Sequence, residues 1–400
     1  MNESNYWTTV EKYKKYIMPT YAPSLLMVKG QGTWLWDAEG KRYLDFASGI
    51  SVCNIGHCHP AVTKAIQHQA ETLVHISNLY MNEKQPVLAE KLIEHCFDGV
   101  VFFANSGAEA NEGLIKFARK WGAEQGKYEI ITMKDSFHGR TLATLAATGR
   151  SKYRKDFAPD MPGFVQVAFN DFEAVKNAVT DKTVAIMLEP VQGEGGIMPA
   201  DTEYLKQVRA LCDEKNILLM FDEVQCGMGR TGYLFAYKGY GVEPDALSLA
   251  KALGNGFPIG AFIVKRKHAS TLGFGTHAST FGGTPLACAA AIAVLDTIHN
   301  EQILANCIQM GLYLKEKISK MAAKYPVIKA VRGRGLMLGV VLDREASKLL
   351  PLLLKHGMIA LSAGETVLRL LPPLNVSQDE ADLALQIMEK GFAELSASDQ

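Results

Sequence analysis

Residues 183–224 read TVAIMLEPVQGEGGIMPADTEYLKQVRALCDEKNILLMFDEV, and their pattern sets the architecture expected of the chain. An apolar run, TVAIMLEP, comes first, a segment with helical spacing follows at TEYLKQVRALCDEKN, and a second apolar run ends in FDEV. Apolar runs with little polar alternation are typical of strands that helices cover on both faces. The stretch therefore predicts a strand–helix–strand unit inside an α/β sheet.

The same alternation extends through the middle of the chain. Further apolar runs, each followed by turn residues or a helical segment, occur at GVVFFANSG, YEIITM, DALSLA and GAFIVK. We expect a large α/β domain over residues 55–300, in which helices cover a central sheet. Residues 301–400 mix helices with strands and predict a smaller α+β domain, and residues 1–54 are expected to pack with it.

Composition and charge narrow the class of protein. The 400 residues are 48% hydrophobic and 21% charged, as in an ordinary globular enzyme, and 42 basic residues balance 42 acidic ones. This balance provides no bulk field for nucleic acid or an anionic membrane, so we expect neither as a partner. The N-terminus lacks the apolar core of a secretory signal, and PLACAAAIAVL is too short to span a bilayer. The expected location is the cytoplasm.

The seven cysteines are scattered and odd in number, which favours a reducing compartment over a disulfide framework. One local cluster, CNIGHCHP, brings Cys53, His57, Cys58 and His59 close together in the sequence. Zinc ligands usually come in pairs on two separate segments, and the sequence has no second cluster of this kind. We therefore expect no metal site and interpret the cluster as a turn before a helix.

In open α/β sheets ligands bind at the carboxyl ends of the strands, so the residues there are the candidates for a site. After VVFFA come Asn105, Ser106, Gly107 and Ala108, a turn of small residues that opens a helix. Its free backbone N–H groups and the helix dipole suit a phosphate, although a plain N-cap fits the same residues. The turn is neither a Walker loop nor a GxGxxG motif, so it does not imply a nucleotide.

Two further strand ends carry side chains that suit a flat, charged ligand. After EIITM, Phe137 can cover a ring and Arg140 can grip a carboxylate, or they are a core phenylalanine and a surface arginine. After ILLMF, Asp222 suits a protonated pyridine nitrogen and Gln225 a phenolic oxygen, unless the acidic residues of DEVQ only cap the loop. Each pair has an ordinary structural explanation when it is taken alone.

Lys251 follows the apolar run DALSLA and precedes three spaced glycines. On its own it is a solvated lysine at a strand end, but a buried lysine is tolerated when its nitrogen is neutral or bound to an aldehyde. Together, a phosphate cradle, a ring cover, an acid for a ring nitrogen and an amine describe pyridoxal phosphate. The strand ends thus predict a site for this cofactor.

These segments resemble the class III (ω-amino-acid) aminotransferases of pyridoxal-phosphate fold type I. The resemblance runs nearly end to end, through LWDAEGKRYLDFASGI, NSGAEANE, FHGRT, EPVQGEGG, FDEVQCGMGRTG, LAKALGNGFPIGA, STFGGTPLACAAA and LRLLPPL. It implies a large α/β domain with a central, mostly parallel seven-stranded sheet, a smaller α+β domain, and a homodimer with shared active sites. Among these enzymes the motifs look most like those of the acetylornithine aminotransferases.

The resemblance also implies roles for individual positions. Lys251 and Asp222 are expected to be catalytic, Lys251 as the Schiff-base lysine and Asp222 as the partner of the ring nitrogen. The expected cofactor contacts are Ser106, Gly107, Ala108, Phe137, Asp222, Gln225, Lys251 and Thr280, of which Thr280 would reach the phosphate of the neighbouring subunit. The expected substrate contacts are Arg140, Ser279, Glu194 and Arg369, with Glu194 neutralising Arg369 until a dicarboxylate displaces it.

The implied activity is transfer of the terminal amino group of N-acetylornithine to 2-oxoglutarate, which gives N-acetylglutamate 5-semialdehyde and glutamate in arginine biosynthesis. Close alternatives are 4-aminobutyrate, free ornithine or a succinylated donor, since FHGRT also looks like the corresponding stretch of 4-aminobutyrate transaminases. A mutase or decarboxylase of the same fold would need no external acceptor, and a non-catalytic, cofactor-binding regulator is the remote alternative. LAKALGNGFPIGA and LSAGETVLRLLPPL favour acetylornithine.

Overall fold

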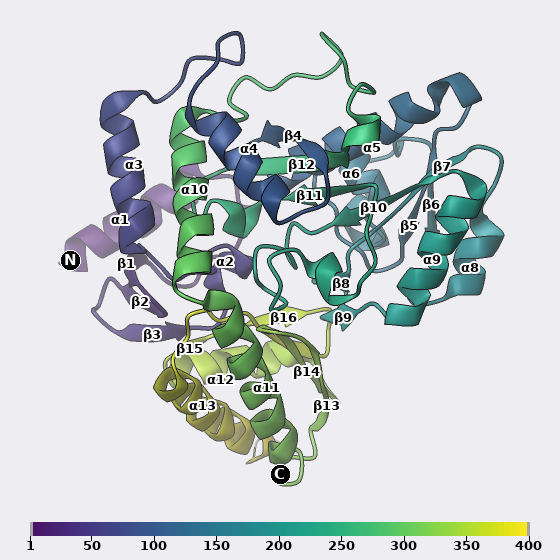
Figure 1. Cartoon of the computed structure of the whole chain (residues 1–400). Helices are drawn as coiled ribbons and strands as arrows, with labels where there is room; N and C mark the ends of the chain where they lie inside the picture. Colours follow the sequence, from purple (N-terminus) through teal and green to yellow (C-terminus); the bar gives the residue numbers. More distant parts are fainter. Residues whose placement is uncertain (1–2, 398–400) are drawn as a thin grey trace.

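The chain folds around a seven-stranded sheet that helices enclose on both faces (Figure 1). The structure, a computed structural model, describes residues 3–397. Neighbouring strands follow the order β4-β12-β11-β10-β7-β5-β6. Their bounds are β4 (Gly99–Ala104), β5 (Glu129–Met133), β6 (Phe164–Val167), β7 (Thr183–Leu188), β10 (Leu218–Asp222), β11 (Ala246–Leu249) and β12 (Gly260–Lys265).

All the strands of this sheet run in one direction except β12. β11, β10, β7, β5 and β6 are parallel, whereas β12 is antiparallel to both of its neighbours, β11 and β4. The expected α/β fold with a mostly parallel, seven-stranded sheet is therefore confirmed. Because the parallel strands share one carboxyl edge, the turns that follow them converge there. β12 is reversed, so its first residue, Gly260, pairs with Ala104 at the end of β4.

Helices form the two outer layers. Helices α5 and α6 lie over one face of the sheet, while α8 and α9 cover the other, and α10 packs against α3 and α4. The helices of this part of the chain are α2 (Ser48–Ser51), α3 (Pro60–Thr72), α4 (Lys84–Glu94), α5 (Gly107–Gly122), α6 (Leu142–Ala147), α7 (Ser151–Arg154), α8 (Phe172–Ala178), α9 (Thr202–Lys215) and α10 (Pro285–Asn300). A short hairpin, β8 (Val191–Gln192) and β9 (Met198–Pro199), follows β7.

Alternate residues of a central strand face two separate hydrophobic cores. In β10, Leu218 and Met220 belong to the core under α5. Leu219 and Phe221 face the opposite way, into the core under α9. Each of these side chains is buried, and leaving water contributes about 1.5–3 kcal/mol for each. Burial on both faces explains why the strands read as continuous apolar runs.

The C-terminal part of the chain has a sheet of its own. Its strands follow the order β13-β14-β17-β16 and are antiparallel. The strands are β13 (Ile328–Arg334), β14 (Met337–Leu342), β16 (Leu361–Ala363) and β17 (Val367–Leu370), and the helices beside them are α11 (Ile303–Met321), α12 (Leu350–Lys355) and α13 (Gln378–Ala397).

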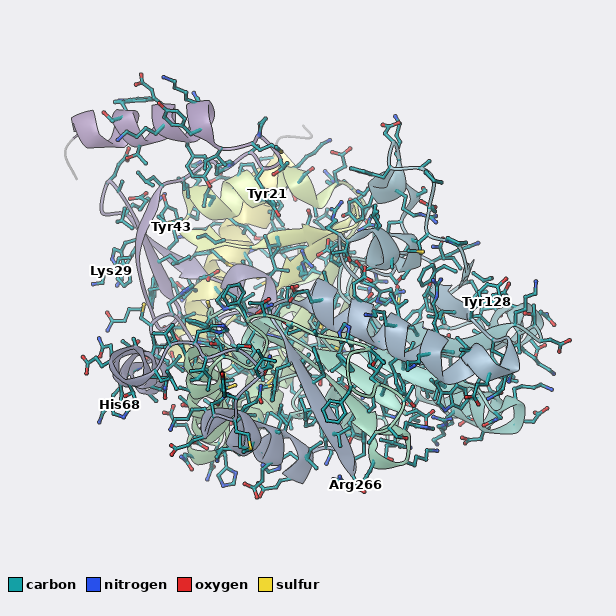
Figure 2. The ribbon with its side chains drawn as sticks, turned by 90° about the horizontal axis from the view of Figure 1, so that it is seen from above. Tyr21, Lys29, Tyr43, His68, Tyr128 and Arg266 are labelled. Carbon is teal, nitrogen blue, oxygen red and sulfur yellow. The ribbon has the colours of Figure 1, made fainter. Side chains whose placement is uncertain are left out.

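The N-terminal strands are hydrogen-bonded to this C-terminal part. They form a second small sheet in the order β1-β2-β3-β15, where β3 runs parallel to β15. Its strands are β1 (Met27–Gln31), β2 (Trp34–Asp37), β3 (Arg42–Asp45) and β15 (Met358–Ile359), and helix α1 (Glu3–Tyr16) precedes them. Seen from above, α1 lies at the rim of the molecule, and Tyr21 just after it is 87% exposed (Figure 2).

The cluster CNIGHCHP forms a turn that leads into α3. Gly56 N–H donates to the carbonyl of Cys53, and His59 is the residue before the first turn of the helix. His57 Nε2 lies 2.7 Å from Asp45 Oδ2. Within residues 3–397, no three His, Cys, Asp or Glu side chains converge as metal ligands, and the seven cysteines are free thiols. No helix in the same range is both long and apolar enough to cross a membrane.

Candidate active site

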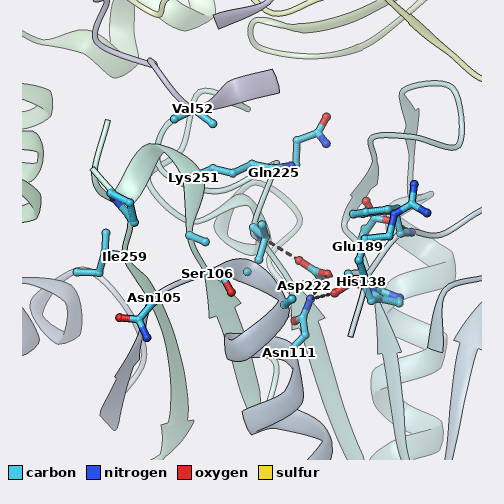
Figure 3. A pocket seen from close by; sticks show the side chains of 18 of the residues that line it. Val52, Asn105, Ser106, Asn111, His138, Glu189, Asp222, Gln225, Lys251 and Ile259 are labelled. Carbon is cyan, nitrogen blue, oxygen red and sulfur yellow. Dashed lines mark hydrogen bonds and ion pairs between the residues drawn. The ribbon is translucent and has the colours of Figure 1, made fainter. Parts of the chain in front are cut away.

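A cavity of about 400 Å³ lies at the carboxyl edge of the large sheet, where the turns after β4, β5, β10 and β11 meet (Figure 3). Several predicted site residues line this cavity, although they come from distant parts of the sequence. They are Ser106, Gly107, Ala108, Phe137, Arg140, Asp222, Gln225 and Lys251. The other four predicted residues, Glu194, Ser279, Thr280 and Arg369, lie outside its walls.

Lys251 leaves the end of β11 with an unusual backbone. Its φ is +47°, in the left-handed region that L-residues seldom adopt, and such strain is concentrated at functional sites. Its side chain crosses the cavity between Val52 and Asp222 (Figure 3). Burial, together with the nearby Arg369 cation, lowers the pKa of the Lys251 amine. A larger share of the amine is therefore neutral and nucleophilic than in a surface lysine.

Asp222 ends β10 and is only 3% exposed, yet it has strong partners. Asn111 Nδ2 donates to Asp222 Oδ2 over 2.7 Å, and His138 Nδ1 lies 2.8 Å from the same oxygen. Burial opposes a charge on His138, but the hydrogen bond to Asp222 outweighs it and raises the His138 pKa. Asn111 and His138 were not among the predicted residues. Asn111 lies inside α5 and His138 is a lone histidine, so only the folded contacts identify them.

Glu223, the next residue, faces away from the cavity. Its carboxylate accepts hydrogen bonds from Ala236 N (2.6 Å) and Tyr237 N (2.8 Å), at the start of a short 3-10 helix, Ala236–Gly239. Burial raises the pKa of Glu223 to about 8. Glu223 therefore caps that 3-10 helix, whereas Asp222 both lines the cavity and caps its own loop, since its Oδ1 accepts from Val224 N over 3.0 Å.

Glu189 is a third acidic residue that sequence reasoning did not select. It follows β7 as Asp222 ends β10, and it lines the cavity. Its carboxylate accepts from Phe137 N (2.9 Å) and Gly193 N (3.1 Å), and burial raises its pKa to about 7. A carboxylate at the end of an apolar run, the pattern that indicated Asp222, is present here too and could have identified it.

The turn that opens α5 suits an anionic group. Ser106 is the N-cap, and its Oγ accepts from Glu109 N over 3.1 Å. The next amides, those of Gly107 and Ala108, have no acceptor inside the helix and lie at its positive end. Gly107 also packs closely, since a Cβ there would lie 2.7 Å from Val224 Cγ1. The turn is therefore both an ordinary N-cap and a wall of the cavity.

Phe137 and Arg140 stand at the mouth of the cavity. Phe137 is half-buried and packs edge-on against Tyr153, with the ring centroids 5.9 Å apart. The Arg140 guanidinium lies 4.0 Å from the Tyr153 ring centroid and remains exposed. The stack leaves the guanidinium donors of Arg140 available to a carboxylate that enters the cavity.

Glu194 and Arg369 form an ion pair next to the cavity. Arg369 Nη1 donates to Glu194 Oε1 over 2.5 Å and approaches Gln225 Oε1 at 3.4 Å. Burial alone would raise the pKa of Glu194, but the Arg369 cation lowers it. The pair thus reaches the cavity through Gln225, which lines it.

Ser279 and Thr280 lie in neighbouring hollows rather than in the main cavity. Ser279 Oγ accepts from Asn105 Nδ2 over 3.2 Å, and Asn105 itself lines the main cavity. Thr280 is exposed in a hollow that it shares with Leu79. The chain by itself therefore does not bring Thr280 into the site.

Comparison with known proteins identifies the family. The family model for class III aminotransferases matches residues 16–392. The chain belongs to this family. The expected resemblance is confirmed, and the protein is an aminotransferase.

Individual relatives of this class III aminotransferase match over nearly their whole length. It is 52% identical to the acetylornithine aminotransferase of Caldanaerobacter subterraneus subsp. tengcongensis, over 96% of this chain and 98% of the relative. It is 51% identical to the acetylornithine aminotransferase of Methanocaldococcus jannaschii, over 99% and 100%. Among solved structures, the ornithine aminotransferase of Toxoplasma gondii, with partial occupancy of PLP (pyridoxal phosphate) at its active site, superimposes with a TM-score of 0.94 at 32% identity, covering 99% of this chain and 96% of that one.

Proposed function

We propose that this aminotransferase binds pyridoxal 5'-phosphate in the cavity beside Lys251 and moves the terminal amino group of N-acetylornithine to 2-oxoglutarate. The products are N-acetylglutamate 5-semialdehyde and glutamate. The acetylornithine aminotransferases among its relatives support this substrate. The free thiols also fit work in a reducing compartment such as the cytoplasm.

The residues present fit this cofactor. The unpaired first amides of α5 suit its phosphate, and Asp222 suits a protonated ring nitrogen because Asn111 and His138 hold the carboxylate in place. Phe137 can lie over a flat ring, and Gln225 can reach a phenolic oxygen. When bound, pyridoxal phosphate supplies an aldehyde that takes up an amino group and a ring that withdraws electrons from the neighbouring carbon.

The chain's own residues supply the proton transfers. Lys251 Nζ, with its lowered pKa, can take a proton from the carbon that bears the amino group of the donor. It can then return this proton two atoms away, which completes a 1,3-proton shift. The Asp222 carboxyl group is placed to pair with the ring nitrogen, and its buried hydrogen bonds prevent it from turning away.

The observation that carries the choice of donor is that, among the described residues, every carboxylate that lines the cavity already has hydrogen-bond partners. Two carboxylates line it: Asp222 is engaged by Asn111 and His138, and Glu189 by two backbone amides. Free ornithine would bring an α-ammonium group without a partner, which costs several kcal/mol when it is buried. In N-acetylornithine that amine is masked as a neutral amide. Its single carboxylate then suits the exposed Arg140.

2-Oxoglutarate has two carboxylates and calls for two cations. We infer that Arg140 takes one and Arg369 the other, with the second carboxylate displacing Glu194 from its ion pair. While an N-acetylornithine molecule is bound, Glu194 would stay on Arg369 and keep that buried cation neutralised. Ser279 would approach the substrate from the side of Asn105.

The proposal includes a homodimer in which Thr280 contacts the cofactor phosphate of the neighbouring subunit. Thr280 shares its hollow with Leu79 and Met81, which are 85% and 98% exposed. Tyr80, between them, is 72% exposed. A contiguous exposed apolar patch of this kind is characteristic of an interface between proteins, and a second subunit would cover it.

A donor panel tests the proposed function. With 2-oxoglutarate as acceptor, kcat/KM for N-acetylornithine should exceed that for free ornithine and for 4-aminobutyrate at least tenfold, about 1.4 kcal/mol of differential transition-state binding. Arg140→Ala should slow the N-acetylornithine half-reaction more than the glutamate half-reaction, and Arg369→Ala should do the reverse. If 4-aminobutyrate proves the better donor, the enzyme belongs with the 4-aminobutyrate transaminases; turnover without any acceptor would favour a mutase or decarboxylase.

A further inference from the structure

The loop after β10 contains a buried arginine, Arg230, on which the Asp45 carboxylate acts only from a distance, without a direct ion pair. Arg230 is 0% exposed, and burial lowers its pKa to about 10. Among residues 3–397 no carboxylate forms an ion pair with it. Burying a cation in this way is costly unless its donors are fully used. The hydrogen bonds of the guanidinium must therefore offset the cost of burying Arg230.

The guanidinium of Arg230 joins three stretches that are far apart in the sequence. Nε donates to Ser51 Oγ (2.9 Å) and Nη2 to Asn54 Oδ1 (2.5 Å), both in the segment after β3. Nη1 donates to the carbonyls of Leu336 (3.0 Å), between β13 and β14, and Pro372 (2.6 Å), just beyond β17. All the acceptors are neutral, so the contacts fix geometry rather than balance charge.

One of these stretches has a strained backbone. Ser48, Gly49, Ile50 and Ser51 have φ values of 46°, 61°, 66° and 62°, so they form a left-handed turn. Left-handed backbone costs L-residues about 1–2 kcal/mol each, and a β-branched residue such as Ile50 is a marked outlier there. A turn of this kind persists only where its surroundings hold it.

The turn leads directly into the wall of the cavity. Ser51 Oγ, which Arg230 contacts, donates to the carbonyl of Gln225 over 3.1 Å. The following residue, Val52, lines the cavity together with Gln225 (Figure 3). The strand whose end Arg230 also holds, β17, carries Arg369. One side chain is thus connected to two residues that line the cavity, Val52 and Gln225, and to the strand that carries Arg369 beside it.

We propose that Arg230 is a positioning residue: it holds the strained turn 48–51 against the loop after β10 and the end of β17, and so keeps Val52, Gln225 and Arg369 in place around the substrate. The identity of the substrate rests on the proposed function. The clamp, by which we mean the hydrogen bonds that Arg230 donates to Ser51, Asn54, Leu336 and Pro372, rests only on the contacts described above. Lysine cannot replace this arginine, because an ammonium is a single point with three donors, whereas the guanidinium presents five in a planar fork.

Hydrogen–deuterium exchange of the cofactor-loaded protein tests the clamp without any substrate. The amides of Val52 and Cys53 both donate to the carbonyl of Ser48, over 2.7 and 2.9 Å, and report on the turn. Arg230→Lys should speed their exchange at least about tenfold, because the turn opens locally. Arg334→Lys is the matched control: Arg334 is half-buried and also donates to a backbone carbonyl, that of Gly239. Its variant should leave the turn unchanged.

Relieving the backbone strain at Ile50 tests whether Arg230 positions the turn 48–51 or only stabilises the fold in general. Glycine adopts left-handed backbone as readily as right-handed, so Ile50→Gly in the Arg230→Lys background should return the exchange of the turn toward the wild-type rate. Ile50→Ala in that background should not.

In steady-state kinetics, Arg230→Lys should raise the KM of both substrates more than it lowers kcat, since the binding walls move while Lys251 stays.

Two outcomes would overturn the proposal: unchanged exchange at Val52 and Cys53 in Arg230→Lys, or equal acceleration in Arg334→Lys. If Arg230→Lys does not fold, Ser51→Ala removes the acceptor of Nε, together with the hydrogen bond from Ser51 Oγ to the Gln225 carbonyl, and carries the same comparison. Accelerated exchange in an enzyme that prefers another donor would support the clamp and refute only the proposed substrate.

Discussion

Lys251 combines a left-handed backbone with an amine of lowered pKa, and both follow from where the chain leaves β11. The backbone strain is tolerated because the strand and the turn after it fix the residue on both sides. The lowered pKa arises from burial first and from the Arg369 cation second. Its second cause can be removed by mutation.

We predict that Arg369→Gln raises the pKa of Lys251 toward that of an ordinary lysine. The variant removes a cation that lowers this pKa and leaves the Glu194 carboxylate, which raises it, unpaired. In the cofactor-free protein, acylation of Lys251 measured against pH by peptide mapping should be half-maximal below the range of an ordinary lysine. In Arg369→Gln this profile should move upward, with the peptide of the exposed Lys206 as the internal standard for the reagent. A downward shift would contradict this account of the cavity's electrostatics.

The sequence indicated some residues of the site better than others, for a physical reason. Asp222 and Lys251 stand directly after apolar strands, where a charge is costly and therefore conspicuous. Asn111 sits on a helix, and nothing in its neighbours along the chain reveals that it donates to Asp222. Glu189 had the same pattern as Asp222 and was overlooked. Such contacts between distant residues appear only once the chain is folded.

At the scale of elements, the start of α5 has two roles that can be separated: its N-cap stabilises the fold, and its amides are proposed to bind the cofactor phosphate. We predict that Ser106→Ala and Asp201→Ala each lower the free energy of unfolding by about 1 kcal/mol, because each removes an N-cap. Of these two helices α5 begins at the cavity and α9 does not, so Ser106→Ala but not Asp201→Ala should weaken binding of pyridoxal phosphate. Chemical denaturation of the cofactor-free proteins and titration with the cofactor measure the two effects. Equal loss of cofactor affinity in both variants would argue against a phosphate at α5.

The positions of the strands along the chain were largely predictable, but the direction of each strand in the sheet was not. Continuous apolar runs predicted β4, β5, β7, β10, β11 and β12 because residues on both faces of each strand pack against a hydrophobic core. The antiparallel course of β12 left no trace in its composition, since GAFIVK reads like its parallel neighbours. The left-handed turn 48–51 was equally hidden, because only one of its residues is glycine and the contacts of Ser51 with Arg230 and Gln225 join residues that are far apart in the sequence.

At the scale of the whole molecule, the proposed homodimer predicts complementation. Thr280→Ala and Lys251→Ala proteins should each have low activity, and mixing them under conditions of subunit exchange should restore part of it. In a hybrid dimer one site carries both lesions and the other carries neither, if Thr280 serves the neighbouring subunit. Hybrids that stay inactive, although mass spectrometry shows that they have formed, would mean that Thr280 does not act across the interface.

The reversed strand β12 also has a consequence for biosynthesis. β4, at residues 99–104, lies at the edge of the sheet and pairs only with β12, at residues 260–265. A ribosome-bound chain therefore exposes an apolar strand without a partner until more than half of the protein has been made. Strand edges of this kind attract other chains. We expect the nascent polypeptide to be prone to pairing with other chains during this interval, which ends when Gly260 to Lys265 leave the exit tunnel.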